Sequence, residues 1–229
     1  MKYLVQQLGL PLIIVFLMII SIVLINGGQY QLVILILVIS ACLPLVKKYE
    51  QKTLNTKELA LLAVLVSIAV LGRFLFFMVP AVTPMTSIII IVGICLGAES
   101  GFLVGILSAV TSNILFGQGP WTPFQMFSWG IIGLVAGFPF VQKKIKQQPF
   151  LLAVYGIVAG LFFSFFMDLW TVFSLDHTFS WPRYATLLIS AIPYTCTYCF
   201  SNVFFSLLLL PTMEKKLARI LQKYGIKNN

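Results

Sequence analysis

Three long stretches of this chain carry no charged residue, and they constrain its fold more than any other feature. They run from Tyr3 to Val46, from Ser100 to Gln142 and from Tyr184 to Met213. A single membrane-spanning helix takes roughly 20 apolar residues, so each stretch is too long for one span and must be divided at its glycine, proline and asparagine residues. Only 9% of the 229 residues are charged and 60% are hydrophobic, which is outside the usual range of soluble domains. The sequence therefore predicts an all-α, polytopic membrane protein.

Turn signals divide the chain into eight expected helices. The first two are separated by the sequence Asn-Gly-Gly-Gln at 26–29, which is a strong turn signal. We expect residues 1–56 to form an N-terminal transmembrane hairpin with a basic connector, and residues 57–229 to form a six-helix membrane domain with a basic tail. The expected helices are 8–26, 30–46, 58–79, 84–98, 100–116, 122–141, 150–173 and 185–211.

The positions of the basic residues predict an orientation. If the N-terminus lies inside, every lysine and arginine except Arg73 and Arg183 falls in a segment on the inner side of the membrane, as the positive-inside rule requires. We therefore expect a multi-pass protein of the cell membrane with both termini in the cytoplasm. The basic residues behind the net charge of +9 lie between the hydrophobic segments, where they can contact the lipid bilayer. No nucleic-acid partner is therefore predicted.

Two ionisable residues lie within expected spans, where charge is unfavourable and often marks a functional site. Arg73 is near the outer end of the helix expected over 58–79, and Asp168 is inside the helix expected over 150–173. We interpret both as candidates for a polar cavity. Two alternatives remain open: the Arg73 side chain could extend to the interface, and Asp168 could be a buried structural partner of Arg73 or of a tyrosine.

The expected outer loop around residues 116–126 has an unusual composition. Two glycines and two prolines restrict its backbone, while Gln118, Trp121 and Gln125 offer amide groups and a stacking surface to a neutral polar ligand. Trp129 follows one turn later and is included among the candidate ligand contacts. An interfacial aromatic belt is the alternative explanation, and it accounts for Trp121 but not for the two glutamines.

The sequence offers no metal site, no cofactor site and no catalytic set. Cys196 and Cys199 form a Cys-x-x-Cys without a second ligand pair, and His177 has no histidine or cysteine close in sequence. No catalytic triad, His-Glu-x-x-His motif or acidic cluster is evident. We therefore predict a protein that is not an enzyme. A self-contained secondary transporter is an alternative, although neither inverted repeats nor a coupling-ion site is evident.

Three segments carry a resemblance to a known family: Glu58–Arg73, Leu96–Ser108 and Gly130–Gly137. With them, the chain from Lys57 to Lys223 resembles the S components of energy-coupling-factor (ECF) transporters. The stretch Gly-Gln-Gly-Pro-Trp-Thr-Pro-Phe-Gln-Met at 117–126 looks most like the S components assigned to cobalamin.

The resemblance implies a six-helix, substrate-binding subunit whose vitamin pocket opens outward. It implies three partners: a transmembrane coupling subunit and two cytoplasmic ATPases that supply the energy. It also implies a docking motif of two small residues in the first core helix, matched here by Ala63 and Ser67 with serine in place of the second alanine. Cobalamin is the expected vitamin, and folate, pantothenate or a queuosine precursor are the alternatives. The N-terminal hairpin is an addition to the six-helix pattern.

Overall fold

The computed structural model describes Ile36 and residues 56–225. The expected hairpin over 8–46 lies outside the described residues except for Ile36, and the domain boundary at residue 56 stays a prediction. Within residues 56–225 all regular structure is helical, which confirms the prediction of an all-α membrane bundle. The helices are α3 (Thr56–Leu75), α4 (Met85–Leu96), α5 (Ala98–Phe116), α6 (Thr122–Ala136), α7 (Pro139–Gln147), α8 (Pro149–Asp176), α9 (Trp181–Ser190) and α10 (Ile192–Tyr224).

Four of these helices are long and apolar enough to cross a membrane: α3, α5, α8 and α10. The pair α6 and α7 reaches that length only together, and it is bent by 72° at the break between the two helices. The sequence predicted one helix over 122–141, but α6 ends at Ala136 and Pro139 begins α7. Proline lacks a backbone N–H and restricts the residue before it, so it favours a new helix start over continuation.

The last expected helix, 185–211, is also divided. A short helix α9 ends at Ser190, and α10 begins at Ile192 with Pro193 in its first turn. From there α10 continues through Pro211 to Tyr224, well beyond the apolar run on which the expected boundary rested. Its final turns are basic and polar, so hydrophobicity alone gives no signal for them.

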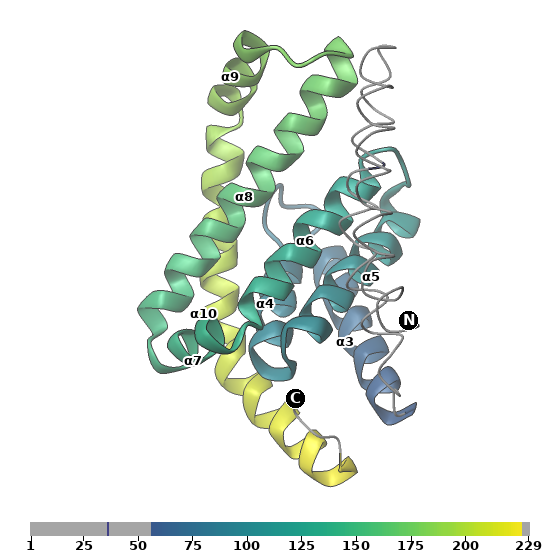
Figure 1. Cartoon of the computed structure of the whole chain (residues 1–229), viewed down its shortest axis with the longest axis vertical. Helices are drawn as coiled ribbons and strands as arrows, with labels where there is room; N and C mark the ends of the chain where they lie inside the picture. The colour runs from purple at the N-terminus through teal and green to yellow at the C-terminus, as the bar shows by residue number, and fades with distance from the viewer. Residues whose placement is uncertain (1–35, 37–55, 226–229) are drawn as a thin grey trace, which may run out of the picture.

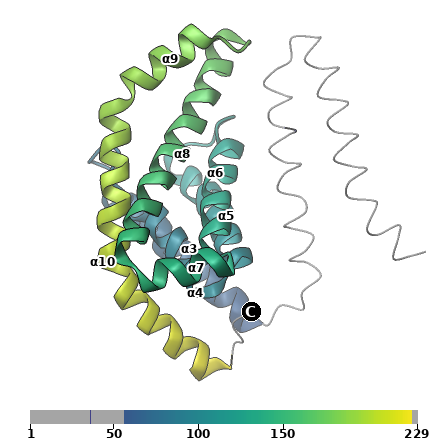
Figure 2. The same ribbon diagram turned by 60° about the vertical axis from the view of Figure 1, so that its left-hand side comes forward.

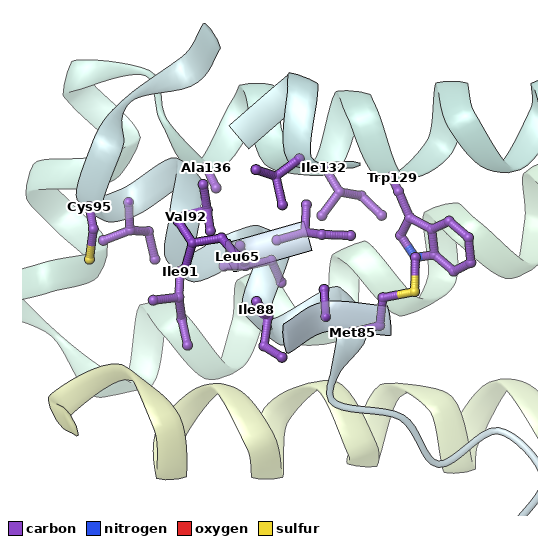
Figure 3. Close-up of a cluster of buried hydrophobic side chains, with 14 of the residues drawn as sticks. Leu65, Met85, Ile88, Ile91, Val92, Cys95, Trp129, Ile132 and Ala136 are labelled. Carbon is purple, nitrogen blue, oxygen red and sulfur yellow. The ribbon is translucent and has the colours of Figure 1, made fainter. Parts of the chain in front are cut away.

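The short helix α4 lies at the centre of the bundle and packs against α3, α5, α6, α7 and α10. The four consecutive isoleucines at 88–91 in α4 are all buried, as expected for a helix that is apolar on every side. Figure 3 shows side chains of this core, with Leu65 of α3 and Ile132 of α6 beside α4. Helix α10 covers another side of α4, and α8 packs antiparallel to α10 and also contacts α6 and α7.

The two ends of the bundle differ in charge. The start of α3, helix α7 and the final turns of α10 lie at one end, which we call the basic end, and α9 lies at the opposite end (Figure 1). At the basic end Lys146 Nζ pairs with Glu214 Oε1 at 3.5 Å, and Lys57 Nζ donates to the Tyr224 carbonyl oxygen at 3.3 Å. This separation matches the charge pattern behind the predicted orientation, and the cytoplasmic location of the termini stays a prediction.

Glycines bring α5 and α6 into backbone contact. A Cβ atom on Gly133 of α6 would fall on the carbonyl group of Gly101 in α5, and one on Gly101 would fall on the carbonyl group of Gly133. Further along the pair, a Cβ on Gly105 would meet the carbonyl group of Trp129. Such small residues allow close helix packing in a membrane, where lipid gives no hydrophobic drive for helices to associate.

Gly133→Ala is expected to destabilise the fold, because the added methyl group has to displace the backbone of α5. Overpacking of this kind typically costs about 1–3 kcal/mol. The measurement is thermal unfolding of the purified protein in detergent. Gly156→Ala is the matched control, since its Cβ would lie 3.2 Å from the nearest atom, Val203 N. Equal melting temperatures for the two variants would contradict the close contact.

Candidate functional site

Arg73 lies in the last turn of α3 and points toward α5. Its Nη1 atom donates to Ser112 Oγ at 2.7 Å and to Asn113 Oδ1 at 3.2 Å. The guanidinium carbon is 4.8 Å from the ring centroid of Phe116 and 5.5 Å from that of Trp129, within the range of cation–π attraction. The side chain is therefore held against the bundle by two hydrogen bonds and two rings, and does not extend along the helix to the interface.

Asn113 links Arg73 to the loop before α6. An arginine side chain can only donate hydrogen bonds, so the amide oxygen of Asn113 faces Arg73 and its NH₂ group faces away. That NH₂ group donates to Thr122 Oγ1 at 2.9 Å and to Gln125 Oε1 at 2.7 Å. Asn113 is fully buried, and both of its amide N–H groups and its oxygen have partners. It therefore fixes α3, α5 and α6 relative to one another.

The loop continues this hydrogen-bond network. Thr122 Oγ1 donates to Gln118 Oε1 at 3.0 Å, and Gln118 Nε2 donates to the Val110 carbonyl oxygen at 2.9 Å. Three residues selected from the sequence, Arg73, Gln118 and Gln125, thus belong to one connected network. Sequence analysis missed the residue that joins them, Asn113, although an asparagine within an otherwise apolar helix was an available signal.

Trp129 belongs to a second polar cluster deeper in the bundle. Its Nε1 atom donates to Thr86 Oγ1 at 3.0 Å and to the Tyr198 hydroxyl at 3.2 Å, and these two hydroxyls also bond each other. Its ring stacks on Phe163 with centroids 4.8 Å apart. With only 2% of its surface exposed, Trp129 lies beneath Arg73 and joins α6 to α4 and α10.

A cavity of about 300 Å³ opens beside Arg73, at the end of the bundle away from α7. Its walls come from the last turn of α3, the segment between α3 and α4, the end of α5 and the start of α10. That segment is fixed to α10 because the Thr83 N–H donates to Ser201 Oγ at 2.9 Å and the Ser201 hydroxyl donates back to the Thr83 carbonyl at 3.1 Å. The lining includes Arg73, Phe76, Phe77, Thr83, Phe116 and Tyr194.

This lining combines one cation and two hydroxyl groups with aromatic rings. Small-molecule sites are typically concave and carry a few fixed polar groups, and in this cavity Arg73 is such a group. The sequence singled out only Arg73 among its lining residues. The aromatic residues at 76, 77 and 116 carry no signal of their own, since phenylalanine is common throughout the chain.

The other expected site residues lie outside this lining. Trp121 is 38% exposed and its ring packs on Gly119, while Gln118 and Gln125 lie behind Arg73 in the network. Asp168 is in α8, and no hydrogen bond or ion pair joins it to Arg73. Its Oδ2 atom is buried and has no hydrogen-bond partner among the described residues. The structure thus places the expected contacts in separate positions instead of one constellation.

Ala63 and Ser67 lie on an exposed face of α3. The Ser67 hydroxyl donates to the Ala63 carbonyl oxygen at 2.9 Å, so the helix itself satisfies its polar group. Next to them, Val64 is 54% exposed and Ile68 is 43% exposed. An apolar groove of about 450 Å³ runs between this helix and α10. The face is apolar, which suits contact with lipid or with another transmembrane helix.

A helical membrane bundle with a mixed polar and aromatic cavity at one end defines a membrane protein equipped to bind a small solute. Residues 57–222 match the model of the family described as ECF transporter, substrate-specific component. The chain therefore belongs to this family, which confirms that part of the sequence interpretation. No curated protein and no solved structure gives a significant match.

Membership has three consequences. Proteins of this family are transporter subunits and not enzymes, and they work with a transmembrane coupling subunit, ATPase subunits and a small-molecule substrate. The matched residues begin at Lys57, so the family accounts for the helices from α3 to α10 and not for the N-terminal segment. The family description does not specify which small molecule is bound.

Asn113→Leu is expected to destabilise the bundle. The substitution keeps a similar side-chain volume but removes the partners of Arg73, Thr122 and Gln125, and unsatisfied buried polar groups typically cost about 1–3 kcal/mol each. Thermal unfolding in detergent measures the effect. Gln118→Ala is the comparison, because Gln118 is exposed and water can replace its bonds. If Asn113→Leu unfolds at the wild-type temperature, Asn113 does not hold the three helices together.

Proposed function

We propose that this chain is the subunit of an ECF importer that binds a vitamin or vitamin precursor, and that the ligand occupies the cavity beside Arg73. The observation that carries this assignment is the fixed position of Arg73 in an aromatic cavity. Two hydrogen bonds from α5 and two rings orient its guanidinium group before any ligand arrives. A preorganised polar group loses little freedom on binding, and this favours affinity.

Two observations bear on the identity of the vitamin, and they favour different compounds. The sequence of the loop at 117–126 favours cobalamin, the ligand of the S components that it resembles. The cavity volume of about 300 Å³ is at the lower end of the range for ligand sites, which favours a smaller vitamin or precursor such as pantothenate. Mass spectrometry of small molecules released from the detergent-purified chain decides between them.

The orientation that we propose places the cavity outside and the basic end in the cytoplasm. The cavity and α7 lie at opposite ends of the bundle, and the lysines at 143, 144 and 146 belong to α7. The positive-inside rule assigns such lysines to the cytoplasmic side. In this orientation the ligand enters from outside, as an uptake subunit requires.

We propose that the coupling subunit docks on the exposed face of α3 around Ala63 and Ser67. Two small residues one turn apart allow the backbone of a second helix to approach closely. The groove between α3 and α10 continues this face, with Leu71 and Leu208 among its apolar walls. Docking there leaves the cavity free, because the groove and the cavity share only Phe76 among their lining residues.

Uptake is expected to require the partner proteins, because the chain contains no nucleotide-binding motif and no evident ion-coupling site. Liposomes that contain the chain alone are compared with liposomes that also contain the coupling subunit and both ATPases, with ATP inside. Accumulation of the released vitamin is expected only in the second preparation. If the chain alone accumulates the vitamin and an ionophore abolishes this accumulation, the chain is a secondary transporter instead.

The double variant Ala63→Leu, Ser67→Leu is expected to lose the coupling subunit while it keeps ligand binding. Two leucines on adjacent turns would hold a partner helix away from the α3 backbone. Pull-down of the coupling subunit and ligand titration of the same preparation measure the two properties. Ala185→Leu, an equally bulky change at an exposed position in α9, is the control. Normal assembly of the double variant would contradict docking at this face.

A further inference from the structure

We propose that the substrate of this subunit is an organic anion and that its carboxylate group binds Arg73. This inference rests on the proposed function, since it concerns the chemistry of the ligand in the same cavity. It predicts discrimination by charge: a carboxylic acid binds, and its neutral amide or alcohol counterpart binds far more weakly.

The first observation is that Arg73 has no acidic partner in the described part of the chain. The ion pairs found there are Arg183 Nε with Asp176 Oδ2 at 3.0 Å and Lys146 with Glu214. Arg73 instead donates to a hydroxyl and to an amide oxygen, which carry only partial negative charge. Its positive charge is therefore not neutralised by an ion pair with any residue of the described part of the chain.

The second observation is that half of the guanidinium group remains available. A guanidinium group carries five N–H donors, and Nη1 contributes two of them. Both hydrogen bonds that Arg73 donates to described residues start from Nη1, so the three N–H groups on Nη2 and Nε have no acceptor among residues 56–225. Adjacent N–H groups of this kind match the two oxygens of a carboxylate, which an arginine binds by two parallel hydrogen bonds.

The third observation is that no other charge in the cavity opposes an anion. No described aspartate or glutamate lines it. Helices α3 and α5 end at the cavity whereas α4 and α10 begin close to it, so the partial charges at the helix ends offset one another. Arg73 therefore determines the sign of the electrostatic potential in the cavity.

The surroundings of Arg73 strengthen this preference. The rings of Phe116 and Trp129 cover the guanidinium group and keep bulk water from part of it. A partly buried charge without a counter-ion is unfavourable, and a bound counter-ion relieves that cost. Charge-assisted hydrogen bonds in such an environment are roughly twice as strong as neutral ones. Phe76 and Phe77 then remain to contact an apolar part of the ligand.

The test uses matched pairs of compounds that differ in charge but little in shape: nicotinate and nicotinamide, pantothenate and pantothenol, biotin and biotin amide. Cobalamin is included as a bulky, amide-rich compound. Each is titrated by calorimetry against the purified full-length chain in lipid nanodiscs. We expect at least one acid to bind, about tenfold or more tightly than its neutral counterpart, where tenfold corresponds to 1.4 kcal/mol.

The variants identify the residue responsible. Arg73→Gln is expected to remove the difference between acid and neutral counterpart, and Arg73→Lys is expected to retain part of it, because lysine keeps the charge but not the paired donors. Arg183→Gln is the matched control: it removes an exposed arginine that is already paired with Asp176, and it should leave discrimination unchanged. If Arg73→Gln does not fold, the comparison of each acid with its neutral counterpart in the wild-type chain decides alone.

Three outcomes overturn the inference. One is a neutral compound that binds as tightly as its acid, or cobalamin binding that persists in Arg73→Gln. In either case the proposed function stands, but the substrate is not an anion held by Arg73. Another is discrimination that persists in Arg73→Gln, which would assign charge recognition to a different residue. A wild-type chain that binds none of these acids contradicts the inference, and the proposed function is contradicted only if mass spectrometry also finds no small molecule released from the purified chain.

Discussion

Close contact between the backbones of α5 and α6 is the constraint on which the rest of the structure depends. Within a membrane, apolar side chains gain little from leaving lipid for another apolar surface, so helices associate through close packing and polar contacts. Glycines at 101 and 133 allow both, because no side chain separates the two helices. The contact brings Asn113, near the end of α5, next to Thr122 and Gln125 at the start of α6. The loop between the helices is thereby fixed at both ends.

The polar network has more effect here than the same bonds would have in water. An amide or hydroxyl group that lost its partner in this interior would find no water to replace it, and a low dielectric strengthens each remaining bond. Asn113 accepts a hydrogen bond from Arg73 of α3 with its amide oxygen and donates both amide N–H groups to α6. Arg73 is consequently positioned by groups that are themselves fixed, and this arrangement gives a ligand site its geometric selectivity.

The sequence predicted the architecture well because uncharged runs and turn residues reflect the membrane directly. It failed at two boundaries that hydrophobicity does not mark: the break before Pro139, which is a local effect of proline, and the extension of α10 past Pro211. For the site, Arg73 was recognisable because a charge within a span is rare. An asparagine within an apolar helix was a signal that sequence analysis did not use, and the role of Asn113 as a link between α3, α5 and α6 becomes evident only from its contacts in the fold. Trp121 was selected for its stacking surface and Asp168 for its charge within an expected span, and neither property determines whether a side chain faces the cavity.

Helix α10 connects the two ends of the molecule. Tyr194 in its first turn lines the cavity, and its last residue, Tyr224, accepts a hydrogen bond from Lys57 at the start of α3. At 1.5 Å per residue, its 33 residues extend over about 50 Å, and Pro211 removes one backbone hydrogen bond between the two parts, where a helix bends most readily. One element thus lines both the cavity beside Arg73 and the groove next to α3. If a ligand changes the bend of α10 and so changes the affinity for a partner at that groove, thermodynamics requires the partner to change the affinity for the ligand by the same factor.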